Sequence, residues 1–143
     1  MSEQNKALER RLIEEVWNRG DYAVVDELVA SDYVGHSSSP ETEMHGTAGY
    51  RQFYVALRTA FPDLQVTIED QIAEGDEVVS RWTARGTHKG AYAGIPPTGK
   101  HGMVTGVTVE RIADGKVVEC WTNSDELGLL QQIGVIPRPE GTG

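Results

Sequence analysis

From Leu64 onward the sequence alternates apolar and polar residues, and this period of two constrains the fold most strongly. Leu64, Val66 and Ile68 alternate with polar residues, as expected for a strand with one buried face. Gly75-Asp76 and Asp114-Gly115 are typical tight-turn signals. Together these features predict a meander of four antiparallel strands. Its strands are expected over 64–69, 78–88, 103–112 and 116–123, with an irregular Gly- and Pro-rich loop at 89–99.

Helical periodicity dominates the first half of the chain. Leu8, Leu12 and Val16 recur on one face of an amphipathic segment that ends at Gly20. Further helices are expected after the possible cap Asp21 and before the helix-breaking Pro62. The predicted helices cover 3–19, 21–30, 47–60 and 126–133, with an extended piece at 33–36 and a loop at 37–45.

This order of elements predicts an α+β fold. A cone-shaped, curled antiparallel sheet would pack on the N-terminal helices, in a single domain over residues 1–143. The final residues, about 136–143, are expected to form a loose tail. A curled sheet leaves a concave face lined by alternate strand residues, which is a common place for a ligand pocket.

Charge and composition exclude several classes of partner. The formal net charge is −9, whereas a nucleic-acid-binding surface is basic, so no nucleic acid is expected. No apolar run approaches the roughly 20 residues that span a bilayer, and the N-terminus lacks the apolar stretch of a signal peptide. We therefore expect a cytoplasmic protein without membrane contact. Cys120 is the single cysteine and cannot form an intrachain disulfide.

Asp125 is the strongest candidate for a catalytic residue. It follows the last predicted strand, on which Trp121 shares its parity. A carboxylate beside an indole in an apolar cup would have a raised pKa, which suits a general acid or base. The alternative is that Asp125 caps the helix that starts at Glu126, and the two roles can coexist.

The histidines and one strand pair supply further candidates. His36 and His88 lie on or beside extended segments and could project into the cup, or could fix loops through hydrogen bonds. Arg81 and Trp82 are adjacent on a strand, so only one of them can face the concave side. Arg81 inside would need a carboxylate such as Asp125. The histidines show no metal-ligand spacing, and we expect no metal.

Aromatic residues, including Tyr33, Phe53 and Trp121, could line a pocket for a planar ligand, although most of the aromatic side chains are expected in the core. The sequence has no nucleophile elbow, phosphate loop, dinucleotide fingerprint or paired cysteines. This leaves acid–base chemistry without a cofactor, or simple binding of a small hydrophobic ligand.

An ordered set of short motifs resembles the SnoaL-like polyketide cyclases, a family within the nuclear transport factor 2-like superfamily. Each motif is weak alone, but the set covers nearly the whole chain. The matching stretches are 17–21 (WNRGD), 32–36 (DYVGH), 60–63 (AFPD), 73–76 (AEGD), 81–83 (RWT), 86–90 (GTHKG), 114–119 (DGKVVE), Trp121, Asp125, 129–134 (LLQQIG) and Pro137.

The resemblance implies a cone-shaped fold that forms homodimers or homotetramers through the sheet. It also implies that Asp125 is the acid–base group of an intramolecular aldol cyclisation of an aromatic polyketide ester, with no cofactor. The ligand would be a small hydrophobic, aromatic carbonyl compound. Characterised cyclases carry an assisting histidine on the preceding strand, whereas Thr108 and Arg111 occupy that region here.

Three other functions remain open from the residues. The cup could belong to a binding module without catalysis, or to a polyketide hydroxylase-like member of the superfamily. Epoxide-hydrolase-like chemistry would require Asp125, Arg81 and a further acid such as Asp70 to converge on one water. A bulge that turns Asp70 outward is the favoured alternative.

Overall fold

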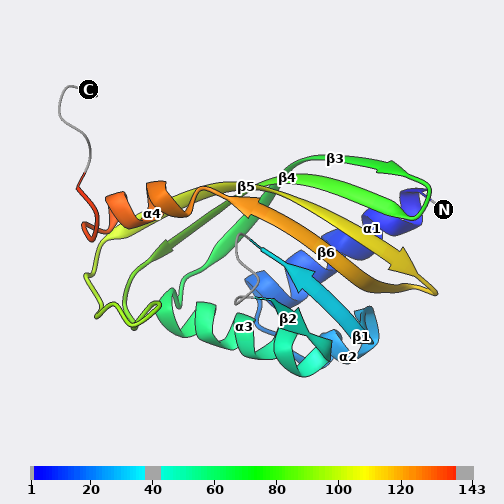
Figure 1. Ribbon diagram of the computed structural model, residues 1–143, viewed down its shortest axis with the longest axis horizontal. Helices are drawn as coiled ribbons and strands as arrows, with labels where there is room; N and C mark the ends of the chain where they lie inside the picture. The colour runs from blue at the N-terminus through cyan, green and yellow to red at the C-terminus, as the bar shows by residue number, and fades with distance from the viewer. Residues whose placement is uncertain (1, 38–42, 138–143) are drawn as a thin grey trace.

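A computed structural model describes residues 2–37 and 43–137 of the protein. Most of the expected tail and the centre of the expected loop at 37–45 lie outside these residues. Six strands form one sheet in the order β2-β1-β6-β5-β4-β3 (Figure 1). Their bounds are Val29–His36 (β1), Met44–His45 (β2), Gln65–Glu74 (β3), Glu77–Thr87 (β4), His101–Ala113 (β5) and Lys116–Ser124 (β6).

The antiparallel meander β3–β6 is confirmed, but the complete sheet is mixed. β1 runs parallel to β6, and β2 pairs antiparallel with β1. The first two residues of β1, Val29 and Ala30, were expected at the end of a helix. Pairing with β1 covers the edge of β6 that would otherwise expose unpaired backbone groups, while Val29 and Tyr33 are buried in the core. The sheet is curled but not closed into a barrel.

The predicted helices are confirmed, with one change of geometry. α1 (Ser2–Leu12) continues without a break as a π-helical segment, η1 (Ile13–Asn18). The wider turn leaves carbonyl groups free, and Arg58 Nη1 donates to the carbonyls of Trp17 at 2.8 Å and Asn18 at 3.2 Å. The remaining helices are α2 (Ala23–Leu28), α3 (Gly46–Ala60) and α4 (Glu126–Gln132).

The helices α1 to α3 lie together on one side of the curled sheet (Figure 1). α4 packs against the first residues of β5. Two buried clusters fill the space between these layers. One surrounds Val25, Tyr33 and Val78, and the other surrounds Phe61, Trp82 and Ile133. Among the described residues, no helix is long and apolar enough to cross a membrane.

Candidate functional site

A cavity of about 600 Å³ lies between the concave face of the sheet and the helices η1, α3 and α4. Alternate residues of the central strands face it, because successive side chains of a pleated strand point to opposite faces. They are Ser80, Trp82 and Ala84 on β4, Val104, Thr108 and Glu110 on β5, and Cys120, Thr122 and Ser124 on β6. The walls are mainly apolar, with a few polar groups on the strands.

Trp82 is the member of the Arg81–Trp82 pair that faces the cavity. Its ring lies over Gly106, where a Cβ atom would stand 2.4 Å from the indole Cζ2. This close approach lets the indole Nε1 donate to Thr108 Oγ1 at 2.8 Å. Thr108 Oγ1 lies 3.4 Å from Thr122 Oγ1 on the neighbouring strand. Because Gly106 has no side chain, the indole N–H of Trp82 reaches the hydroxyl of Thr108 in the cavity wall.

Asp125 lies at the mouth of the cavity, at the junction of β6 and α4. Its Oδ1 accepts a hydrogen bond from the backbone N–H of Gly128 at 2.9 Å, so Asp125 is the N-cap of α4. The other oxygen, Oδ2, has no hydrogen-bond partner among the described residues. Gly128 provides the space for this carboxylate, since a Cβ atom there would lie 2.2 Å from Oδ2. The cap leaves one carboxylate oxygen available.

The expected surroundings of Asp125 differ from those in the structure. Trp121 lies on the opposite face of β6 from Cys120 and Thr122, is 38% exposed and does not line the cavity. Asp125 is itself exposed. The strand alternation that linked the two residues stops where β6 ends at Ser124, so their parity did not put them on one side.

Trp121 instead stacks on His36, with ring centroids 5.5 Å apart and planes at 22°. His36 borders the cavity, but both of its ring nitrogens are engaged by carboxylates. Nδ1 lies 3.0 Å from Glu43 and Nε2 lies 2.7 Å from Glu119, which also binds Arg111 at 3.0 Å. This arrangement holds β1, β2 and β6 together and leaves no free nitrogen on His36 to act as a proton carrier.

Replacing His36 with Gln is expected to lower the free energy of unfolding more at pH 6 than at pH 9. The hydrogen bond to Glu119, and then that to Glu43, raise the pKa of His36 against the opposing effect of desolvation. The stabilisation is thus complete below the unfolded pKa of about 6.5 and disappears as pH rises through the higher folded pKa. Urea unfolding of both proteins at several pH values measures this. A constant difference would show that the charge of His36 contributes nothing.

Glu119 determines the pH below which the interaction with His36 no longer stabilises the fold. Its hydrogen bonds to His36, and then to Arg111, lower the pKa of this carboxyl. The stabilisation is present above the ordinary Glu pKa of about 4.3 and is lost as pH falls through the lower folded value. The contribution of the His36–Glu119 pair is therefore expected to be greatest between about pH 5 and 6.5.

Arg81 and Asp70 lie away from the cavity. Arg81 is exposed on the outer face of β4, and Asp70 is its exposed neighbour on β3. The register shifts between Ile68 and Asp70, so the expected bulge turns Asp70 outward. Neither residue converges with Asp125, and the group required for epoxide-hydrolase-like chemistry is not formed.

His88 is completely buried but lies behind the cavity wall, packed against Phe61 and Tyr92. Its Nδ1 lies 3.0 Å from Thr98 Oγ1 and accepts from the backbone N–H of Thr98 at 3.2 Å. It therefore fixes the loop between β4 and β5, as its alternative interpretation predicted. At the mouth, the hydroxyl of Tyr92 from this loop donates to Glu126 on α4.

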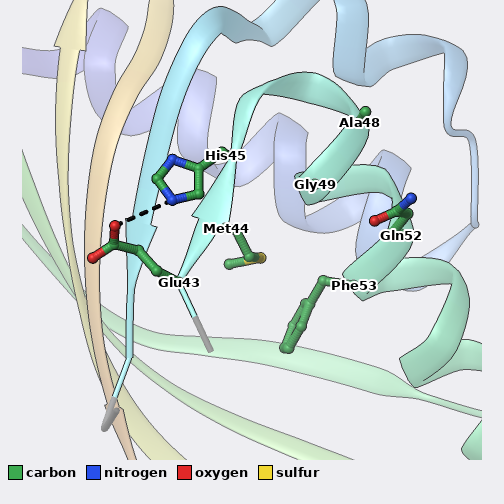
Figure 2. A pocket seen from close by; sticks show the side chains of 7 residues that line it. All are labelled: Glu43, Met44, His45, Ala48, Gly49, Gln52 and Phe53. Carbon is green, nitrogen blue, oxygen red and sulfur yellow. Dashed lines mark ion pairs between the residues drawn. The ribbon is translucent and has the colours of Figure 1, made fainter. Parts of the chain in front are cut away.

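Tyr33 and Phe53 both contribute to the cavity wall, Tyr33 from the buried core and Phe53 from the half-exposed side of α3. Phe53 also borders a separate shallow groove on the surface. Figure 2 shows this groove, where Glu43 and His45 form an ion pair at 3.2 Å beside Met44.

Two acidic residues that line the cavity, Glu9 and Glu110, were not among the candidates predicted from the sequence. Both carried a signal in the sequence. Glu9 lies on the apolar face of the first helix, three residues before Leu12, and Glu110 alternates with Thr108 and Ile112 on the inner side of β5. Within residues 2–37 and 43–137, no three His, Cys, Asp or Glu side chains gather to hold a metal ion.

Comparisons with known proteins agree on one family. Residues 7–133 match the SnoaL-like polyketide cyclase family. The chain is 29% identical to nogalonic acid methyl ester cyclase of Streptomyces nogalater, covering 89% of this chain and 95% of the relative. It is 28% identical to aklanonic acid methyl ester cyclase DnrD of Streptomyces peucetius, with 94% of each chain covered.

Solved structures extend this similarity to the fold. A protein from Jannaschia sp. CCS1 assigned as a SnoaL-like polyketide cyclase matches with a TM-score of 0.86 and 29% identity over 95% of both chains. AclR from Streptomyces galilaeus, assigned as a hydroxylase, matches with a TM-score of 0.85 and 32% identity, covering 98% of this chain and 87% of AclR. The family match over residues 7–133 includes all six strands and the helices α2, α3 and α4, and the chain belongs to the SnoaL-like polyketide cyclase family.

Proposed function

We propose that this protein closes a ring in an aromatic polyketide ester by a cofactor-free intramolecular aldol reaction, with Asp125 as the acid–base group. The observation that carries the proposal is the largely apolar cavity with a carboxylate at its mouth. An apolar cavity of this size suits a planar ligand of several rings. The names of the two cyclase relatives, which specify methyl esters of polyketide acids, indicate the class of substrate.

In the proposed reaction, Asp125 Oδ2 removes a proton from the activated carbon between two carbonyl groups of the substrate. The resulting enolate carbon attacks a ketone carbon within the same molecule, and a new carbon–carbon bond forms. The ketone oxygen becomes an alkoxide and takes up the proton that Asp125 removed, which regenerates the carboxylate, so the net change moves one proton from carbon to oxygen. No electrons leave the substrate, and the reaction requires no redox partner.

Two threonine hydroxyls in the cavity wall, those of Thr108 and Thr122, can support the enolate. Thr108 accepts from Trp82, and when Thr122 is the donor within the Thr108–Thr122 pair, the proton of Thr108 can point into the cavity. Hydroxyl donors aimed at a developing oxyanion stabilise it most in a site from which water is excluded. Thr108 stands in the strand region where characterised cyclases carry the assisting histidine, while Arg111 binds Glu119 outside the cavity.

The test is turnover of nogalonic acid methyl ester and aklanonic acid methyl ester by the purified protein, with product identified by mass and retention time against the spontaneous reaction. Stereospecific ring closure above the background rate supports the proposal. A protein that binds both esters with micromolar affinity but closes neither ring would be a binding module. Formation of a product one oxygen heavier would indicate hydroxylase-like chemistry, as the similarity to AclR suggests.

We also propose that two copies associate through the outer face of the sheet. Ile72, Val79, Val109 and Trp121 lie side by side across β3, β4, β5 and β6. Ile72 and Trp121, at the two ends of this row, are exposed, as is Val107 two residues from Val109, and a group of exposed apolar side chains on a sheet is typical of a contact surface.

Val107→Lys is therefore expected to shift the protein from dimer or tetramer to monomer, because the association would bury a charge without a partner. Light scattering coupled to size-exclusion chromatography measures the mass. The matched control is Val55→Lys, which adds the same charge at an exposed valine of α3 and should leave the mass unchanged. A monomeric wild type, or an unchanged mass in Val107→Lys, would remove this surface from consideration.

A further inference from the structure

Two carboxyl groups from distant parts of the chain meet at the closed end of the cavity. Glu9 comes from α1 and Glu110 from the centre of β5, and both line the cavity. Their exposed fractions are only 1% and 5%. Buried acids are costly unless their polar atoms are satisfied, so this pair calls for an explanation beyond packing.

The two carboxyls influence each other, because a side-chain hydrogen bond with Glu9 is one of the causes that raise the pKa of Glu110. Burial, and then the interaction with Glu9, raise the pKa of Glu110 well above its usual value, which favours the protonated form. Behind the pair, Gln71 Nε2 donates to Glu9 Oε1 at 2.9 Å. With its proton directed to Glu9, the carboxyl of Glu110 retains a carbonyl oxygen as an acceptor.

Tyr50, which lines the same cavity as Glu110, supplies a complementary donor. Its oxygen accepts from Trp17 Nε1 at 3.3 Å and interacts with the hydroxyl of Tyr54. Tyr50 is 2% exposed and lines the cavity, and burial followed by the nearby Glu110 raises its pKa well above the usual value. The phenol therefore stays protonated, and an oxygen already occupied as an acceptor leaves its own proton for another partner.

The Glu9–Glu110 pair lies far from Asp125. The backbone N–H of Asp125 donates to the carbonyl of Thr105, and Glu110 lies five residues further along β5. At about 3.4 Å per residue, this separates the two sites by roughly 17 Å. A base and an acid that act on one forming bond must both lie within hydrogen-bond reach of it. The pair therefore does not serve the same reaction centre as Asp125.

We propose that Glu110, held by Glu9 and flanked by Tyr50, recognises a hydroxyl group at the end of the ligand remote from the reacting ring. The ligand hydroxyl would donate to the carbonyl oxygen of Glu110 and accept from Tyr50. This inference rests on the proposed function, because it names the substrate class of the same cavity: an elongated, fused-ring carbonyl compound with a hydroxyl on its distal ring. The site then selects substrates by length and by hydroxylation.

The test compares the binding of two probes, methyl anthraquinone-2-carboxylate and its analogue with one hydroxyl on the ring remote from the ester. Quenching of tryptophan fluorescence reports binding without any need for turnover. We expect wild type to bind the hydroxylated probe about tenfold more tightly, since a hydrogen bond in a water-excluded site contributes about that much. Equal affinities in wild type would overturn the proposal without any variant.

Two variants of Glu110 test whether this residue causes the preference for the hydroxylated probe. Glu110→Met removes the polar atoms at similar length and should abolish the preference, leaving affinity for the unsubstituted probe within about twofold. Glu110→Gln retains one donor and one acceptor and should keep most of the preference. A preference that survives in a folded Glu110→Met protein would show that the pair is only structural. If Glu110→Met does not fold, loss of the preference in Tyr50→Phe provides the same comparison.

The comparison of the two probes measures binding and does not depend on catalysis. Asp125→Asn is expected to bind both probes as wild type does, so a failure of the proposed reaction leaves the binding comparison intact. An analogue with an amino group that is protonated at neutral pH, placed where the hydroxyl stands, tests the charge of the site. Tighter binding of this cation than of the hydroxylated probe would overturn the assignment to a neutral hydroxyl.

Discussion

Asp125→Asn is expected to lower kcat for ring closure by about 10²–10⁴-fold, with little change in the affinity for the ester. The amide keeps the shape of the carboxylate and can still accept from Gly128, but it cannot take a proton from carbon. Single-turnover measurements with saturating protein separate this effect from binding. Because Asn is as good an N-cap as Asp, the free energy of unfolding should remain within about 0.5 kcal/mol of wild type.

A series at the same position separates the two roles of Asp125. Asp125→Ser also retains a capping oxygen, so it should match Asp125→Asn in both stability and loss of activity. Asp125→Ala removes the cap as well and should cost a further ~1 kcal/mol of stability. If activity follows stability through the series, with Asn and Ser close to wild type, Asp125 is only a cap and the proposed mechanism fails.

Gly106→Ala is expected to reduce the free energy of unfolding by about 1–3 kcal/mol and to weaken ester binding. The new Cβ atom would lie 2.4 Å from Cζ2 and 2.7 Å from Cη2 of Trp82, and 2.9 Å from the carbonyl oxygen of Asn123. The indole cannot bend, and Asn123 is part of the backbone of β6, so neither neighbour yields easily. The ring must move from β5 and would give up its hydrogen bond to Thr108.

Gly49→Ala is the matched control for this substitution. Gly49 lies inside α3, and a Cβ atom there would meet Met44 at 3.6 Å, an ordinary contact. Ala is the better helix former by about 1 kcal/mol, so Gly49→Ala should leave the protein unchanged or more stable. Thermal unfolding of both variants, with ester titration, makes the comparison. Similar stability of the two variants would show that the close approach of Trp82 to Gly106 does not restrict the fold.

Local patterns in the sequence predicted most of the secondary structure. The alternation from Leu64 and the turn at Gly75 led to β3 and β4, and the period of Leu8, Leu12 and Val16 led to the first helix. These signals are local, because a strand or helix with one buried face repeats its apolar residues at a fixed interval. The parallel pairing of β1 with β6 was not predicted. It joins segments almost ninety residues apart, and neither segment has a sequence pattern that indicates its partner or their register.

The candidate site was predicted less completely. Placement of Asp125 after the last strand was sufficient to put it at the mouth of the cavity, but parity with Trp121 was misleading because the strand ends between them. Adjacent residues on a strand face opposite ways, so the sequence established that only one of Arg81 and Trp82 faces inward. The space over Gly106 decided that it is Trp82.

The sequence by itself therefore determined the elements, their order and the resemblance to a family, because each depends on neighbours along the chain. The tertiary structure decided which faces of those elements meet. Glu9 and Glu110 are separated by most of the chain, and only the packing of α1 against the curled sheet brings their carboxyls together at the end of one cavity. A contact of that kind depends on how distant elements pack, and no local period in the sequence records it.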